Sequence, residues 1–476
     1  MNDGLSAALS VGRLFLSVSL LMGTCLLFPA LCMSATPYCH EYFVKPDGDD
    51  YSSGLAPGVA WATIQHAADL ADPGDIVTVL DGEYPESVKI HRSGSSAAWI
   101  TFRAQNRHRA KIYHPDRSCF DIGSDSERVG YVVIEGFDIK APGVYGKGIS
   151  SNRGAHHLRI VDNYAHDCGE SGISLADGDY RFVEHNIATR NGWLMPDCGS
   201  GITMWGLQPF DDGPGWHNIV RSNVSFANDN GPTTKRTDGN GIIIDDFRNV
   251  QGGHTGAPAK NVNYSGCRTL IEGNLCFGNG GRGIQVFISN DVLVVNNTVF
   301  CNNTRSNDGT TWRGELSASC SGDVTFANNL AVTNSDSSSN ALASRNSAVL
   351  SGALKGDYAG SDYKYFNNLT FDLANPSSRS WCTDGIEIEA FQEHGNLLAT
   401  DPLLPAEQTK VDGMNVAKVD ALFALPPDSP ARLKGDPRHV TAQSDLPGNL
   451  RMTPQHQVDL GAIQSTPSNT RAKKPQ

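Results

Sequence analysis

Short apolar runs alternate with polar corners along the middle of the chain, and one asparagine recurs at the same place in each repeat. Each of these asparagines follows an apolar run and precedes another apolar residue, as in LRIVDNYA and RFVEHNIA. The shortest interval is 23 residues, and the longer ones are typical of the same repeat with insertions. Such repeats predict a parallel β-helix, whose insertions fall on loops that often form the binding face. The asparagines are Asn163, Asn186, Asn223, Asn274, Asn297, Asn329 and Asn368.

A second strand of each repeat opens with a glycine and an isoleucine. Because side chains alternate along a strand, the isoleucine should face the core. The recurring asparagines should stack into an amide ladder at one corner, which is a structural role. The isoleucines are Ile149, Ile173, Ile202, Ile242 and Ile284.

The flanks of the repeat set the expected domain organisation. The stretch ATIQHAADLA has apolar residues at helical spacing before a Pro-Gly stop, and predicts a helix that caps the first coil. Residues 396–465 are Pro-rich and irregular, and should pack along the outside or cap the last coil, while residues 466–476 should be disordered. We therefore predict an all-β protein, a single-stranded right-handed parallel β-helix (solenoid) over residues 38–395.

The N-terminus carries an apolar stretch after Arg13 that ends at small residues near Ala35. This pattern is typical of a secretory signal over residues 1–35, and an uncleaved anchor is the alternative. We expect a secreted protein, extracellular or periplasmic, with no membrane contact after cleavage. Cysteines beyond the signal should partly pair in that compartment, and Cys168 with Cys198 is the expected disulfide because they lie on successive repeats.

The formal net charge is −13 and the isoelectric point is near 5.5. Basic residues form no long run before the tail RAKKPQ, which argues against nucleic acid as a partner. An acidic polymer would need local Lys or Arg side chains or a bridging divalent cation. We expect the protein to act as a monomer.

Three stretches resemble secreted right-handed β-helix proteins, including pectate lyases of polysaccharide lyase family nine. They are the region from YFVKPDGDD to LDGEYPESV, the Asn/Gly coils, and the C-terminal series DPLLPAE, DSPARLKG and VDLGAIQ. The resemblance covers most of residues 40–465 and implies the fold. It implies less about activity, because this solenoid hosts lyases, hydrolases, epimerases and non-enzymes.

The candidate site lies on the strand in TKRTDGNGIIIDDFRN, which has large insertions before and after it. If Ile242 faces the core, Asp245 faces outward. Aligning the coils on the Gly-Ile pair places Trp205, Asp245 and Phe287 on adjacent strands, roughly 5 Å apart. A carboxyl group between exposed aromatic rings suits sugar binding and acid–base catalysis, whereas aromatic packing beneath the insertion loops is the alternative.

Charged residues surround this strand in the sequence. Asp238, Asp245 and Asp246 are hard oxygen ligands that predict a calcium site, and aspartates that form turns are the alternative. Lys235 and Arg236 can supply a base or bind a substrate carboxylate in β-elimination, and solvated loop charges are the alternative.

The chain departs from the family-nine pattern at two places. That family has its catalytic lysine near the end of this strand, where this chain has Asp245. It has calcium-binding aspartates in the next coil, where this chain has GGRGIQ with Arg282. Neither the base nor the full calcium site is carried over. Our candidate catalytic residues are Asp245, Asp246 and Lys235, and our candidate substrate-binding residues are Trp205, Phe287, Arg236 and Arg282.

The sequence predicts a secreted polysaccharide-active enzyme, first of all a lyase that cleaves a uronate-containing polymer by β-elimination. A glycoside hydrolase with paired carboxylates is the alternative. Because adjacent strand residues point to opposite faces, the partner of Asp245 would then come from Asp197, Asp211, Asp212 or Asp238. A polymer-level epimerase and a non-catalytic glycan-binding or structural β-helix also remain open.

Overall fold

The computed structural model describes residues 39–123, 128–195, 198–231, 238–249, 251, 268–305, 313–334, 340–345, 362–383, 394–405 and 416–465. Residues Cys39–Gln476 form one compact unit. The predicted signal, the C-terminal tail and the pair Lys235 and Arg236 lie outside the described residues. Within the described ranges, no helix is long and apolar enough to cross a membrane.

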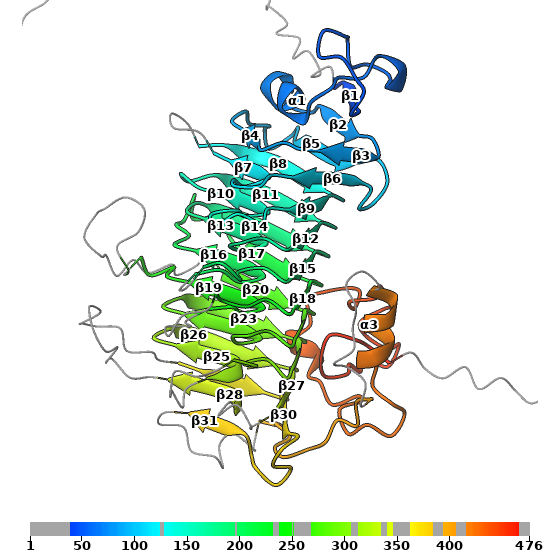
Figure 1. Ribbon diagram of the computed structural model, residues 1–476. Coiled ribbons are helices and arrows are strands. Elements are labelled where there is room, and N and C mark those ends of the chain that lie inside the picture. Colours follow the sequence, from blue (N-terminus) through cyan, green and yellow to red (C-terminus); the bar gives the residue numbers. More distant parts are fainter. Residues whose placement is uncertain are drawn as a thin grey trace, which may run out of the picture. The chain divides into compact units, whose positions relative to one another are not determined.

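Within the described residues, three parallel sheets surround one core, and after the first strand each turn of the chain adds one strand to each sheet (Figure 1). Sheet A has 11 strands: β1 Glu41–Val44, β2 Ile76–Val79, β5 Ile100–Ala104, β8 Gly130–Glu135, β11 His156–Val161, β14 Asp179–Glu184, β17 Trp216–Arg221, β20 Arg268–Glu272, β23 Asn290–Val295, β26 Gly322–Ala327 and β29 Lys364–Phe366. Sheet B has ten strands: β3 Gly82–Tyr84, β6 Ala110–Tyr113, β9 Asp138–Lys140, β12 Tyr164–His166, β15 Ile187–Thr189, β18 Val224–Phe226, β21 Leu275–Phe277, β24 Thr298–Phe300, β27 Leu330–Thr333 and β30 Leu369–Asp372. Sheet C has ten strands: β4 Val88–Ile90, β7 Phe120–Ile122, β10 Ile149–Ser151, β13 Ile173–Ala176, β16 Ile202–Trp205, β19 Ile242–Asp245, β22 Ile284–Phe287, β25 Gly314–Ser319, β28 Asn340–Arg345 and β31 Trp381–Thr383.

Every strand pairs in parallel with the equivalent strand of the next coil. In sheet A, for example, Leu158 of β11 lies opposite Arg181 of β14. The same register recurs in sheet C, where Ile202 lies opposite Ile242 and Ile242 opposite Ile284. The predicted all-β parallel β-helix is therefore confirmed.

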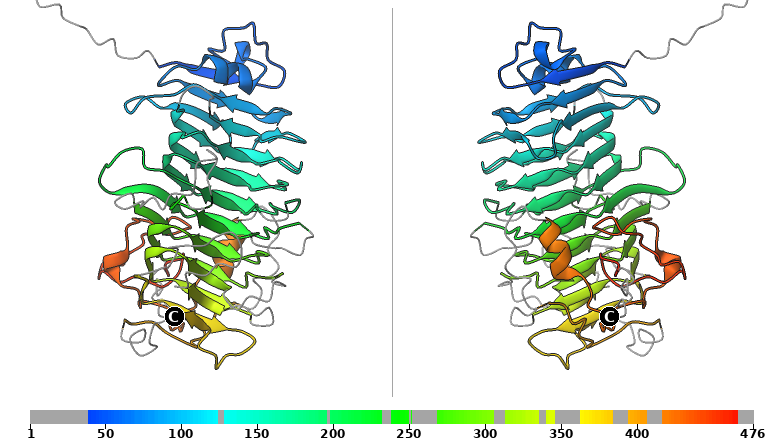
Figure 2. Two further views of the ribbon diagram at one scale, coloured as in Figure 1. Left: turned by 90° about the vertical axis from the view of Figure 1, so that its left-hand side faces the viewer. Right: turned by 90° about the vertical axis from the view of Figure 1, so that its right-hand side faces the viewer.

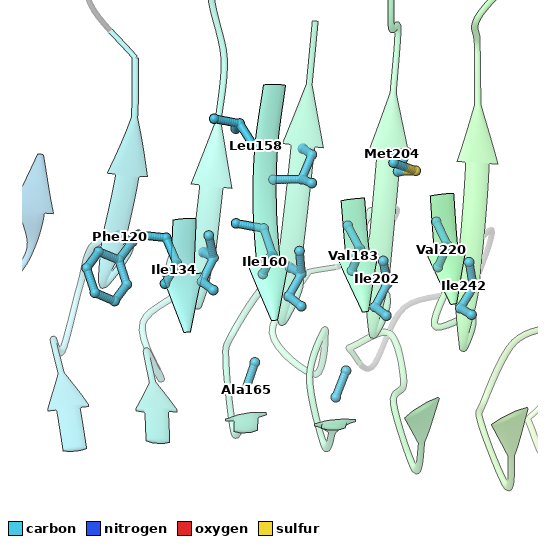
Figure 3. Close-up of a cluster of buried hydrophobic side chains, with 14 of the residues drawn as sticks. Phe120, Ile134, Leu158, Ile160, Ala165, Val183, Ile202, Met204, Val220 and Ile242 are labelled. Atoms are coloured by element: carbon cyan, nitrogen blue, oxygen red, sulfur yellow. The ribbon is translucent and has the colours of Figure 1, made fainter. Parts of the chain in front are cut away.

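The core consists of inward-facing aliphatic side chains from all three sheets (Figure 3). The five isoleucines that open the sheet C strands are all 0% exposed, as the alternation predicted. Ile134 and Ile160 of sheet A and Ala165 of sheet B meet them from the other sides. Burying one isoleucine contributes about 1.5–3 kcal/mol of transfer free energy. Each strand is therefore held in the orientation in which its isoleucine faces the core.

The predicted asparagine ladder is present at the corner between sheets A and B. Asn223 illustrates its bonding: Nδ2 donates to Val183 O at 2.8 Å and to Asn274 Oδ1 at 3.0 Å. The residue before each ladder asparagine has a left-handed backbone, as at Ser222 with φ 54°. The ladder continues beyond the predicted members to Asn396, whose Oδ1 accepts from Asn368.

A second amide ladder, which we did not predict, lies at the exit from sheet B. Its members follow the first ladder by five residues: Asn191, Asn228, Asn279 and Asn302. The ladder ends at Glu315, whose carboxylate oxygens accept from the backbone nitrogen and Nδ2 of Asn302 at 2.6–3.0 Å. Two corners of the coil are thus fixed by buried amides.

The predicted capping helix forms at the N-terminal end (Figure 1). Helix α1 spans Ile64–Leu70, and the Thr63 side chain caps it by accepting from the backbone nitrogen of His66. The short 3-10 helix η1, Pro57–Val59, precedes it. Ile64, Ala67 and Ala68 are buried, so the helix covers the apolar end of the first coil.

The C-terminal segment packs along the outside of sheet B, as Figure 2 shows in orange and red. We expected an irregular segment, but it contains helix α3, Val416–Phe423, and the 3-10 helix η4, Pro437–His439. The ring of Phe423 lies 5.2 Å from that of Phe277 and 5.7 Å from that of Phe300. The outward aromatic residues of sheet B therefore supply the apolar surface on which a short helix can form.

The expected Cys168–Cys198 disulfide is wrong. Cys168 is buried in the core, with Sγ 3.5 Å from the carbonyl oxygen of His166, whereas Cys198 is exposed. Successive repeats alone do not bring two cysteines together, because the side chains must also lie on the same face of the coil.

Candidate functional site

Strands β16, β19 and β22 lie side by side in sheet C and carry the predicted row of side chains. The register pairs Trp205 with Asp245 and Asp245 with Phe287. Adjacent strands are about 4.8 Å apart, so one carboxyl group lies between two aromatic side chains. All three residues are partly exposed. The predicted alignment of these three residues is confirmed, while their role remains a prediction.

The outward direction of this row follows from the inward direction of its neighbours. Ile244 on β19 and Val286 on β22 are 0% exposed in the core, one position before Asp245 and Phe287. Met204 has the same place before Trp205. Ile243, two positions before Asp245, also points away from the core but is only 3% exposed, so this face is open mainly at the ends of the strands.

Asp245 lies in an environment that disfavours its charged form. Burial, followed by the neighbouring charges of Asp238 and Asp246, raises the pKa of Asp245 well above its usual range. The Gln251 side chain donates from Nε2 to Asp245 Oδ1 at 2.8 Å, which partly opposes that shift. A carboxyl group of this kind holds a proton at a pH where an ordinary aspartate has lost it.

Asp246 does not join Asp245 in the row. The strand ends at Asp245, and Asp246 has a left-handed backbone with φ 57° and is 0% exposed. Its backbone nitrogen donates to Phe287 O at 2.9 Å, and its Oδ2 accepts from the backbone nitrogen of Gln251 at 3.0 Å. The predicted catalytic role of Asp246 does not fit this position, because its buried carboxylate holds the turn.

The predicted calcium ligands do not form a cluster. Asp238 Oδ1 accepts from Asn240 Nδ2 at 3.3 Å, while the Asp246 carboxylate is turned into the protein. Among the residues that the structure describes, no three His, Cys, Asp or Glu side chains gather closely enough to hold a metal ion. Asp238, Asp245 and Asp246 therefore do not fit a calcium site by themselves.

Arg282 is part of a polar network at the opposite end of the same strands. Asn240 Nδ2 and Arg282 Nη1 both donate to Gln285 Oε1, at 3.1 and 3.3 Å. The backbone nitrogen of Arg282 donates to Asn240 Oδ1 at 2.8 Å. This network orients the partly buried Arg282 beside the face that bears Phe287. The predicted residues Lys235, Arg236 and Asp197 lie outside the described residues.

The insertion before β17 forms a second polar cluster, which the sequence reading missed. Asp211 Oδ1 accepts from Tyr180 OH at 2.6 Å, and this bond ties Asp211 to β14 of sheet A. His217, buried with Asp179, places Nδ1 2.6 Å from Asp179 Oδ2 and stacks on the Tyr180 ring at 4.1 Å. Phe210 stacks on His156. These contacts fasten the insertion to sheet A. The aspartates of the insertion and His217 of β17 were visible in the sequence, but the fold of the insertion was not.

No family model matches the chain, and no curated protein sequence matches it. Among solved structures, the chain is similar to the pectate lyase Pel9A, with 15% identity, a TM-score of 0.46, and coverage of 90% of this chain and 96% of that chain. It is also similar to the GH136 lacto-N-biosidase from Eubacterium ramulus, with 15% identity, a TM-score of 0.44, and coverage of 72% and 57%. An alginate lyase from Paenibacillus sp. aligns with 16% identity, a TM-score of 0.35, and coverage of 64% and 95%. At such low identities and scores, the similarity alone assigns no activity.

Proposed function

We propose that this protein is a secreted enzyme that cleaves glycosidic bonds in a uronate-containing polysaccharide. The observation that carries the proposal is the place of Asp245 in a row between Trp205 and Phe287, as a partly exposed residue whose carboxyl pKa is raised. Aromatic rings pack on the apolar faces of sugars. A carboxyl group that keeps its proton can protonate the glycosidic oxygen as the bond breaks.

In the lyase reaction, a base removes the proton α to the uronate carboxyl group. The electron pair forms a carbon–carbon double bond, the adjacent C–O bond breaks, and Asp245 donates its proton to the leaving oxygen. Lys235 is the predicted base, and Arg282, held by Gln285 and Asn240, is the predicted contact for the substrate carboxylate. The sequence resemblance to family-nine pectate lyases favours this reaction over hydrolysis.

The test is a panel of uronate polymers, incubated with the protein in the presence and absence of added calcium. Ultraviolet absorbance of the unsaturated product and total reducing ends are measured in parallel. A lyase raises both signals together, and Asp245→Asn should lower both about 10²–10⁴-fold, the usual contribution of a general acid. Asp246→Asn, at the adjacent residue, is the matched control. It should change the stability of the protein without a comparable loss of kcat.

The raised pKa of Asp245 equally suits the acid of a glycoside hydrolase, so hydrolysis is the second candidate. Reducing ends without ultraviolet absorbance would identify it. If neither signal appears on any polymer, and the polymers nevertheless bind, the enzyme proposal fails and the protein is a non-catalytic glycan binder.

A further inference from the structure

The insertion at residues 206–215, between β16 and β17, is docked on sheet A through a histidine ring. It leaves β16 directly after Trp205, where Gly206 has a left-handed backbone with φ 59°. It then reaches β11, where the Phe210 ring stacks on His156 at 4.1 Å, with the planes at 30°. His156 is only 7% exposed, whereas Phe210 is 37% exposed, so the insertion forms the outer layer of this contact.

His156 and His157 are joined by a hydrogen bond that depends on their protons. Their Nδ1 atoms lie 2.8 Å apart, so one ring donates and the other accepts, and the bond is lost when both Nδ1 atoms carry a proton. The His157 ring is held between Tyr131 and Tyr180, whose ring centroids lie 4.5 and 4.2 Å from its own. A Cβ added at Gly130 would lie 2.3 Å from His156 Cε1, so the glycine makes room for the other ring.

The surroundings of the two rings oppose a second positive charge. Burial, followed by the neighbouring His157, lowers the pKa of His156 from 6.5 to about 4. Burial also lowers the pKa of His157. Besides the two tyrosines, the ionisable groups that face the pair come from the loop before β8, from β14, from the insertion and from β17: Arg128, Asp179, Arg181, Asp211 and His217. The carboxylates favour protonated rings, but burial and the arginines outweigh them, since the pKa of both rings is lowered.

The docked insertion contributes to this burial, because Phe210 covers the His156 ring. When Phe210 leaves, water reaches the ring, which then binds its second proton near the ordinary histidine pKa of about 6.5. The docked form therefore binds fewer protons than the released form between pH 6.5 and about 4, and acid favours release. Above pH 6.5 the two forms bind equal numbers of protons, and the full free energy of docking is present.

We propose that residues 206–215 form an acid-released clasp, which is docked on sheet A near neutral pH and opens when His156 and His157 are both protonated. Protonation of both rings removes the bond between the Nδ1 atoms and places two positive charges side by side beneath Phe210. Because the insertion begins at Trp205, its release changes the chain next to the sheet C row. The clasp does not depend on catalysis at Asp245 and can be tested without a substrate.

The far end of the insertion has a separate anchor, which acid does not weaken. His217 Nδ1 lies 2.6 Å from Asp179 Oδ2, and His217 Nε2 lies 2.8 Å from Gly213 O. A proton on His217 strengthens its contacts with these two acceptors. The insertion therefore stays attached at Gly213, and the release is confined to the part of the insertion before it.

The experiment measures hydrogen exchange of the full chain by mass spectrometry at pH 5.0, 6.0 and 7.5. Each exchange rate is divided by the intrinsic rate at the same pH. The peptide that covers residues 206–215 should lose protection by about tenfold between pH 7.5 and pH 5.0, since one histidine with the shift of His156 supplies a change of that order. The peptide that covers β23 is the internal reference and should keep its protection.

The double variant His156→Phe with His157→Phe keeps stacked rings at both positions but cannot bind protons, so the protection of the insertion should no longer depend on pH. His91→Phe, at a side chain that is 43% exposed, is the matched control and should keep the wild-type dependence. Phe210→Ala removes the ring that covers His156, and its insertion should be as weakly protected at pH 7.5 as that of the wild-type protein at pH 5.0. Circular dichroism checks that each variant folds.

Three results would each overturn the proposal. The first is equal protection of residues 206–215 in the wild-type protein at all three pH values. The second is a wild-type pH dependence in a folded double variant. The third is a Phe210→Ala protein that behaves like the wild type, and this comparison remains decisive if the double variant does not fold.

Discussion

At the scale of single residues, the protonation of Asp245 decides what the sheet C row can do. Its pKa is raised, so the proton remains on the carboxyl group above the pH at which an ordinary aspartate ionises, and is lost when the pH rises through the shifted value. If Asp245 is the general acid, kcat/KM on the cleaved polymer should fall on the alkaline side of its optimum.

The pH profile of kcat/KM measures this prediction. In Asp245→Asn the remaining activity should lose that alkaline limb, while in Asp246→Asn the limb should stay. An activity that rises with pH across the same range, and does so only when Asp245 is present, would instead make Asp245 a base.

A second residue-scale prediction concerns Glu315 at the end of the second amide ladder. Burial raises the pKa of Glu315 from 4.5 to about 8, and the residue is 0% exposed. The folded state therefore favours the protonated form: this contribution to stability is complete below pH 4.5 and is lost as the pH rises to about 8. The shift of the Glu315 pKa from 4.5 to about 8 corresponds to at most about 5 kcal/mol in the free energy of unfolding.

Urea unfolding at pH 5 and pH 8 tests this linkage. Glu315→Gln should remove most of the difference between the two pH values, because the amide does not ionise. Glu83→Gln, at a side chain that is 84% exposed, should leave the difference intact. An equal pH dependence in the wild-type protein and Glu315→Gln would show that other groups cause it.

Only some of the side-chain positions at this site could be predicted from the sequence. The alternation of side chains correctly placed Asp245 outward and beside Trp205 and Phe287. Once the buried isoleucine at the start of a strand is known to face the core, the direction of each later side chain on that strand follows. The direction of the Asp246 side chain could not be predicted by alternation, because the strand ends before this residue. Its left-handed backbone turns the carboxylate inward. Gln251 was not predictable, because its contact depends on the path of an insertion rather than on a repeat.

At the scale of elements, the repeat predicted the coils and the first ladder, but not what covers sheet B. Outward aromatic residues of sheet B, such as Phe277 and Phe300, are covered by Phe423 of α3. The periodicity of the coils carries no information about a segment more than a hundred residues away. The second ladder was visible as the same spacing shifted by five residues, yet its asparagines stand among other polar residues at loops.

We expect Phe423→Ala to detach the C-terminal segment while the coils stay folded. Phe423 is 2% exposed, and removing a buried phenylalanine side chain costs about 3–5 kcal/mol. Limited proteolysis should then cut within residues 396–465 faster than in the wild-type protein. Leu450→Ala, at a side chain that is 76% exposed, is the matched control and should not change the rate. Loss of the β-sheet signal in Phe423→Ala would show instead that the segment is needed for the coils themselves.

At the scale of the whole molecule, the net charge of −13 opposes the approach of the acidic polymer that we propose as substrate. A local cation such as Arg282, near the row, acts over a few ångströms. The overall repulsion acts over about one Debye length, roughly 30 Å at 10 mM salt and 8 Å at 150 mM. Added salt should therefore weaken the repulsion more than it weakens the close contacts.

We expect kcat/KM on a long uronate polymer to rise about two- to fivefold between 10 and 150 mM NaCl. The methyl-esterified polymer, which carries few charges, is the control and should show little change. A steady fall with salt on the acidic polymer would mean that local cations dominate its capture.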